Sequence, residues 1–179
     1  DIFLQLVPVA IGVYVGILAS NWNEERKISK SKSATIERLK NELTANQSKI
    51  DNVREYHRMV SDSSSSIKIP ESTDGKNPFS FFQGVRIPRL QNSVFQTASQ
   101  TGITQELDIS LLENLNELYS IQEDYNEFGN TATQALISND FSDTGNFNRI
   151  AILINMTMSD LRYLENELTN QYQKCLQLL

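Results

Sequence analysis

The feature that most constrains this chain is an uncharged stretch at its start. The nineteen residues of Ile2–Ser20 include no Asp, Glu, Lys or Arg and are mostly apolar. A helix of that length spans roughly 28 Å, close to the roughly 30 Å hydrocarbon core of a bilayer. We therefore expect a transmembrane anchor over residues 1–22. The alternatives are a buried helix of a soluble domain and a cleaved signal peptide.

Residues typical of a membrane–water interface follow this stretch. Trp22 stands where an interfacial aromatic ring is common, and Arg26 and Lys27 begin a basic run. Positive charge on that side of an anchor predicts a cytoplasmic location for the domain that follows. A basic segment upstream of Asp1 would reverse this orientation.

Small residues recur every four positions within the predicted anchor. Gly12, Gly16 and Ser20 would share one face of a helix, and small residues at this spacing let two helix backbones approach closely in lipid. This stripe predicts a packing face for a membrane protein partner or for a second copy of the chain.

Residues 23–179 have the pattern of an all-α domain. No proline follows Pro88, which leaves room for long helices. Apolar residues recur at heptad spacing over 36–60, 111–136 and 150–178, with polar interruptions at Asn46 and His57 in the first segment. Asp108 is a candidate N-cap and Gly102 a candidate left-handed cap. We expect the transmembrane helix to continue into an antiparallel three-helix, coiled-coil-like bundle.

The heptads of the last segment predict which of its side chains are buried. The core positions are Ile154, Leu161, Leu164 and Leu168. Thr157 and Gln171 are expected toward the margin of the same face.

A loop excursion is expected at 61–89, where serines, prolines and a polar run interrupt the heptads. It contains three aromatic residues, Phe79, Phe81 and Phe82. These side chains either pin the loop to the bundle or form an exposed docking patch.

Residues with catalytic or metal-binding chemistry are sparse. The chain has one cysteine, Cys175, and one histidine, His57, and the carboxylates Glu113 and Glu117 lack the Glu-x-x-His motif of metal-binding bundles. We expect no catalytic residues, no metal and no cofactor. Residues 90–148 hold nine acids and no Lys or Arg, which argues against nucleic acid as a partner.

Two segments resemble an uncharacterised family of bacterial single-pass membrane proteins. The first runs from Gly16 through Asn21-Trp22-Asn23-Glu24 to Arg26, followed by Asn41-Glu42-Leu43. The second begins at Phe95-Gln96-Thr97-Ala98 and continues through Leu107-Asp108 and Leu118-Tyr119. The resemblance implies a location in the bacterial inner membrane with a periplasmic helical domain.

Together these observations predict a non-enzymatic, membrane-anchored accessory or scaffold protein. Its partners would be the lipid bilayer and either a membrane protein or a second copy of the chain. The alternative is a single-pass sensor whose helical domain binds a small ligand.

Overall fold

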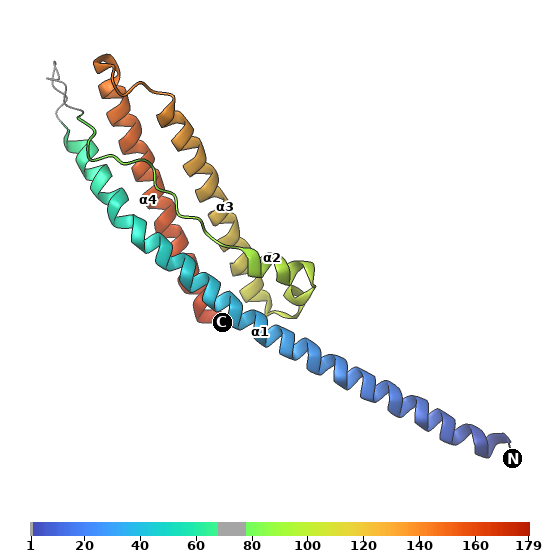
Figure 1. The fold of residues 1–179 in the computed structure, drawn as a ribbon. Helices are drawn as coiled ribbons and strands as arrows, with labels where there is room; N and C mark the ends of the chain where they lie inside the picture. Colours follow the sequence, from blue (N-terminus) through green and yellow to red (C-terminus); the bar gives the residue numbers. More distant parts are fainter. Residues whose placement is uncertain (1, 68–77) are drawn as a thin grey trace. The chain divides into compact units, whose positions relative to one another are not determined.

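The computed structural model describes residues 2–67 and 78–179, with the side chains of residues 2–7, 9 and 10 outside that description. Every regular element in the described part is helical (Figure 1), which confirms the all-α prediction. In chain order the elements are α1 (Ile2–Ser66), α2 (Ser93–Gln100), the 3-10 helix η1 (Ile103–Glu106), α3 (Ile109–Ile137), the 3-10 helix η2 (Thr144–Asn146) and α4 (Phe147–Leu178).

The chain divides into two compact units. Unit 1 comprises residues 1–39 and 93–107, and unit 2 comprises residues 40–92 and 108–179. Unit 1 holds the N-terminal part of α1 with α2 and η1, and its buried side chains include Leu39, Ala98 and Leu107. Gly102 precedes η1 at a φ of 76°, so the predicted left-handed conformation is confirmed.

Unit 2 is a helical bundle built on α4. On α1, His57 contacts Glu165 of α4 and Ser65 contacts Asn155. Because residue numbers rise along one helix as they fall along the other, α1 and α4 run antiparallel. Helix α3 also packs on α4, where Tyr125 contacts Glu165.

The connection between α1 and α3 includes residues 78–92, here called the return segment, which begin with a turn at 78–81 and continue without a helix or strand. It runs back along α1, so that Gly84 lies beside Tyr56, Arg89 beside Lys49 and Gln91 beside Asn46 (Figure 1). In consequence α1 and α3 point the same way. The antiparallel arrangement expected for successive helices is therefore wrong for this pair, because the return segment brings the chain back along α1 before α3 begins.

The core of unit 2 follows the predicted heptads with one shift on α4. Ile154, Leu161 and Leu168 are fully buried as predicted, but Leu164 is half-buried. The buried polar residues of the same helix are Thr157, Glu165 and Gln171. The margin position predicted for Thr157 and Gln171 is wrong, because α4 is covered on two sides, by α1 and α3.

Helix α1 ends later than the loop prediction allows. The expected excursion at 61–89 begins with serines, yet the helix continues to Ser66. The hydroxyls of Ser64 and Ser65 donate to the carbonyl of Ser61, and Ser66 donates to Asp62, at 2.8–2.9 Å. These bonds satisfy the hydroxyls within the helix, so the serine run is compatible with helical structure. Residues 68–77 of the expected excursion lie outside the described residues.

Helix α3 begins where the sequence predicts. The carboxylate of Asp108 accepts hydrogen bonds from the backbone amides of Ser110 at 2.9 Å and Leu111 at 3.4 Å. These two amides have no partner within the helix, so the predicted N-cap is confirmed.

Among the described residues, no helix combines the length and the apolar character needed to cross a membrane. The predicted anchor over residues 1–22 falls in part on side chains outside that description.

Candidate functional site

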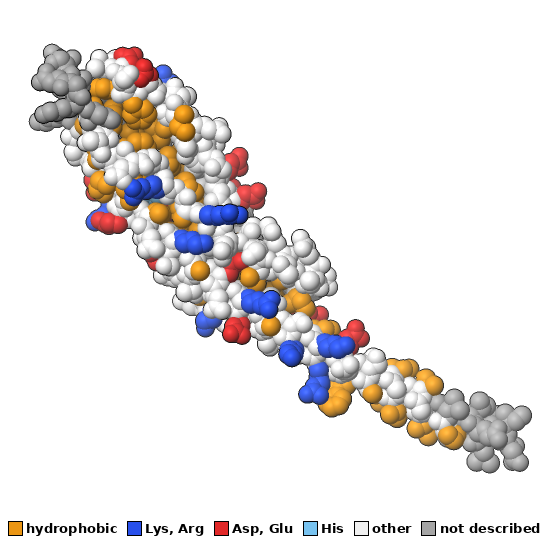
Figure 2. All heavy atoms as spheres, viewed as in Figure 1, with side chains coloured by type: hydrophobic (Ala, Val, Ile, Leu, Met, Phe, Trp, Pro, Cys, Tyr) orange, Lys and Arg blue, Asp and Glu red, His pale blue; other side chains and the backbone are white. Residues whose placement is uncertain are grey.

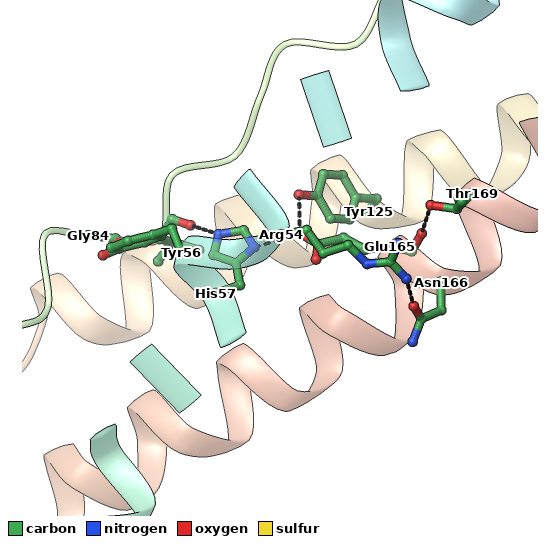
Figure 3. A network of polar contacts seen from close by, with 9 residues as sticks. Arg54, Tyr56, His57, Gly84, Tyr125, Glu165, Asn166 and Thr169 are labelled. Atoms are coloured by element: carbon green, nitrogen blue, oxygen red, sulfur yellow. Dashed lines mark hydrogen bonds and ion pairs between the residues drawn. The ribbon is translucent and has the colours of Figure 1, made fainter. Parts of the chain in front are cut away.

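A fully buried polar cluster of unit 2 centres on His57. This side chain is fully buried on α1, and its Nδ1 lies 2.5 Å from Oε1 of Glu165 on α4. Its Nε2 lies 2.6 Å from the carbonyl oxygen of Val85 in the return segment. The hydroxyl of Tyr125 on α3 donates to the same Glu165 oxygen at 3.1 Å. Three helices and the return segment therefore meet at one pair of side chains (Figure 3).

The hydrogen-bond partners of this cluster define where its protons lie. A carbonyl oxygen only accepts, so Nε2 of His57 carries a proton and donates it to Val85. One further proton lies between Nδ1 and Glu165, which makes the pair either imidazolium–carboxylate or imidazole–carboxylic acid. Both forms are neutral overall, which makes burial of the pair tolerable.

The surroundings of Glu165 are closed to solvent. Its second oxygen, Oε2, is buried and has no hydrogen-bond partner among the described residues. Burial, together with the charge of Glu165, raises the pKa of Tyr125 well above its ordinary value. Both ring nitrogens of His57 have hydrogen-bond partners. The cluster therefore links α1, α3, α4 and the return segment to one another.

A second buried polar cluster fastens the return segment to the bundle. The side chain of Asn46 donates to the carbonyl of Gln91 at 2.6 Å and accepts from the amide of Gln91 at 2.9 Å. Elsewhere in the core, Gln122 on α3 donates to the hydroxyl of Tyr172 on α4 at 2.7 Å. Burial raises the pKa of Tyr172, so its hydroxyl stays protonated. The Asn46–Gln91 hydrogen bonds show that the polar interruption at Asn46 makes a specific contact with the backbone of the return segment.

Cys175 lies on α4 in the buried part of the bundle. Burial raises the pKa of its thiol to about 11, and the negative charge of Glu117 acts in the same direction. At neutral pH the thiol is protonated and is a poor nucleophile.

A polar hollow of about 410 Å³ opens on the surface of unit 2 between α1 and α4. Its arginines are Arg54 and Arg58 from α1 and Arg162 from α4. Arg58 forms an ion pair with Glu55 at 2.7 Å, and Arg54 donates to the side-chain oxygen of Asn166. Asp51 completes the lining.

The predicted membrane residues lie on the N-terminal part of α1. Gly12, Gly16 and Ser20 are exposed, and a Cβ added at either glycine would meet no described atom within 4 Å beyond the backbone of its own helix. The guanidinium of Arg26 lies over the ring of Trp22, 5.1 Å from its centroid, and Lys27 is exposed. Figure 2 shows hydrophobic side chains along this part of the helix, followed by Lys and Arg side chains.

The three predicted phenylalanines differ in exposure. Phe79 is buried, with its ring edge-on to Phe147 at a centroid distance of 5.5 Å, whereas Phe82 is half-buried and stacks on Phe141 at 6.4 Å. Phe81 is half-buried as well. These contacts favour pinning of the return segment to the bundle, and docking at Phe81 and Phe82 stays a prediction.

Sequence reasoning identified His57 as an interruption in the heptads but missed Glu165, Tyr125 and Val85. The signal for Glu165 was weak, because the predicted core position was its neighbour Leu164 and a carboxylate beside an apolar seam is usually exposed to solvent. Nothing in the sequence pairs it with His57, which lies 108 residues earlier.

Among the described residues, no three His, Cys, Asp or Glu side chains are grouped so as to hold a metal ion. No protein-family model, curated protein or solved structure matches this chain significantly. The resemblance to bacterial single-pass membrane proteins therefore stays a prediction.

Proposed function

We propose that this chain is a non-enzymatic, membrane-anchored accessory or scaffold protein that acts through helix–helix contacts. The observation that carries the proposal is the N-terminal part of α1. Its described apolar side chains are half or more exposed: Ile11, Val13, Tyr14, Val15, Ile17 and Leu18. A helix that is apolar on all sides is stable when lipid or other helices surround it.

The residues after this stretch support the same proposal. Trp22 and Arg26 form a cation–π pair, which places an amphipathic ring and a charge at the point where a helix would leave the hydrocarbon. The small-residue stripe at Gly12, Gly16 and Ser20 would then serve a partner helix or a second copy of the chain. We place the anchor in a bacterial inner membrane with the bundle on the periplasmic side, as the family resemblance implies.

The bundle suits a scaffold because its polar core is specific. The His57–Glu165 pair and the Asn46–Gln91 contacts are satisfied only when α1, α4 and the return segment adopt this arrangement. Polar core contacts of this kind penalise alternative packings, since each alternative leaves buried groups unpaired. A defined surface would thereby be offered to a partner.

Alkaline carbonate washing of membranes tests the anchor. The full chain should stay in the membrane pellet, and the double variant Val13→Lys with Ile17→Lys should move to the supernatant, since each Lys at the centre of a membrane helix costs about 2.5–3.5 kcal/mol. The matched control replaces two exposed apolar residues of unit 2, Ile109 and Ile137, with Lys. The control should stay in the pellet. Release of the unmodified chain by carbonate would contradict the anchor.

A second candidate function is a sensor whose helical domain binds a small ligand. The specific observation in its favour is the hollow lined by Arg54, Arg58 and Arg162.

A further inference from the structure

The hollow between α1 and α4 concentrates positive charge in an acidic chain. The chain carries a net charge of −6, yet three of its eight arginines line this one hollow. They come from two helices, with Arg54 and Arg58 one turn apart on α1 and Arg162 on α4. Guanidinium groups gathered in this way repel one another, so the arrangement is stabilised when an anion lies between them.

The carboxylates of the hollow neutralise this charge only in part. Glu55 is paired with Arg58 at 2.7 Å, whereas Arg54 has the neutral amide oxygen of Asn166 as its partner. Within the described part of the chain, Arg162 makes no hydrogen bond or ion pair, although it is half-buried. Two of the three guanidinium groups therefore lack a carboxylate partner among the described residues.

We propose that this hollow binds the phosphate group of a small ligand, with Arg54, Arg58 and Arg162 as the groups that bind it. A single guanidinium fork satisfies a planar carboxylate, whereas three guanidinium groups approaching from two helices match the several oxygens of a tetrahedral phosphate. A hollow of about 410 Å³ falls in the size range of small-molecule sites.

The acidic residues of the hollow set the strength of this binding. Glu55 competes with the ligand for Arg58, and Asp51 lowers the positive potential of the hollow. For phosphate to bind, the guanidinium of Arg58 therefore breaks its ion pair with Glu55 and pairs with the phosphate instead. The affinity is moderate and responsive to ligand concentration, as a sensor requires.

This inference rests on the sensor function for its biological role, but binding is measured independently of the anchor. Release of the unmodified chain by carbonate would contradict the proposed anchor but would not bear on phosphate binding in the hollow. Failure to bind phosphate would contradict the proposed binding site but would not bear on the membrane anchor.

The test is calorimetric titration of the full chain in dodecyl maltoside micelles with inorganic phosphate, at constant ionic strength maintained with chloride. Saturable binding is expected, and Arg162→Ala should weaken it about tenfold or more, as loss of a charge-assisted hydrogen bond does. Arg162→Lys should retain part of the affinity. The matched control is Arg149→Ala, an exposed arginine of α4 outside the hollow, which should bind like the unmodified chain.

Two further titrations locate the source of the phosphate and test the competition. Dihexanoyl phosphatidic acid in the same assay distinguishes a lipid headgroup from a soluble phosphate: tighter binding of the lipid, still lost in Arg162→Ala, assigns the headgroup. Glu55→Gln should tighten phosphate binding about two- to fivefold, because it frees Arg58 from an exposed ion pair. Absence of saturable binding of both probes, or binding unchanged by Arg162→Ala, overturns the proposal.

Discussion

Two parts of the single helix α1 invert the usual relation between polarity and burial. Near the N-terminus, Ile11 is 58% exposed and Trp22 is 63% exposed, although both are apolar or amphipathic. Further along, Glu42 is 5% exposed and His57 is fully buried, although both are titratable. This second part of the helix is covered by α3, α4 and the return segment.

Packing partners, and not hydropathy alone, therefore decide which residues of α1 are buried. His57 is tolerated in the core because Glu165 and Val85 satisfy both of its ring nitrogens. Each exposed Val, Ile or Leu of the N-terminal part would contribute about 1.5–3 kcal/mol if it were buried fully. Under the proposed function, that unburied apolar surface would drive insertion of the helix into a membrane.

The largest expected effect comes from removing the carboxylate of the buried pair. Glu165→Ala leaves His57 and Tyr125 buried without their partner, and loss of one member of a buried pair costs about 3–5 kcal/mol in free energy of unfolding. Urea denaturation of the full chain in detergent, followed by circular dichroism, measures this cost.

Two variants serve as controls for the pair. Glu165→Gln should retain part of the stability, since an amide nitrogen in place of Oε1 can donate one proton to Nδ1 of His57 and the other to the hydroxyl oxygen of Tyr125. Glu167→Ala should change stability by less than about 0.5 kcal/mol, because Glu167 accepts a hydrogen bond from the exposed Tyr163 at the surface. Equal losses in Glu165→Ala and Glu167→Ala would show that the pair is not buried in solution.

A leucine-to-alanine substitution should destabilise the bundle when the leucine is in its core and should have little effect in the N-terminal part of α1. The expected loss of unfolding free energy is somewhat smaller than for Glu165→Ala. Leu161→Ala in the fully buried core should cost about 2–5 kcal/mol, because it opens a cavity. Leu18→Ala, at an exposed position of the N-terminal part, should leave the stability of the bundle within about 0.5 kcal/mol of the unmodified chain. Urea denaturation measures both. If Leu18→Ala destabilises the bundle as much, Leu18 is packed in solution.

Glycine-to-alanine substitutions should change stability in opposite directions in the two parts of the molecule. A Cβ at Gly129 on α3 would overlap the side chain of Ile87 in the return segment, so Gly129→Ala should destabilise the bundle by about 1–3 kcal/mol. A Cβ at Gly16 meets open space, so Gly16→Ala should leave the thermal midpoint unchanged or slightly raised, since Ala is the better helix former. A fall in midpoint for Gly16→Ala would indicate a partner already in contact there.

The smallest effect on stability concerns ionisation of Cys175. Burial raises the pKa of this thiol from its ordinary value of 9.0 to about 11, so its contribution changes only at alkaline pH. Because the raised pKa favours the protonated thiol in the folded chain, that contribution is complete below about pH 9 and is lost as the pH rises through about 11. At pH 8 the folded chain should react with Ellman's reagent far more slowly than the urea-unfolded chain. Equal rates in the two states would show that Cys175 is accessible.

Several local features were predictable from sequence because their causes are local. Asp108 caps α3 because a carboxylate two and three residues before free amides can accept from them. Gly102 adopts a positive φ that other residues avoid. The heptads indicated three long helices and most of the buried leucines and isoleucines.

The serine run at the end of α1 is a case where prediction from local sequence fails. Serines in sequence suggested a loop, but their hydroxyls bond to the preceding turn, and Ser61 and Ser64 are buried. Polar composition cannot distinguish these outcomes, since the choice depends on what packs against the segment.

The amino-acid sequence by itself determined the helical class, the uncharged N-terminal stretch and the cap of α3, because each depends on residues a few positions apart. Only the tertiary structure decided the direction of α3 relative to α1, the partner of His57 and the grouping of Arg54 and Arg58 with Arg162. The last two join residues about a hundred positions apart. Their pairing depends on the path of the return segment, which sets where each helix face comes to lie.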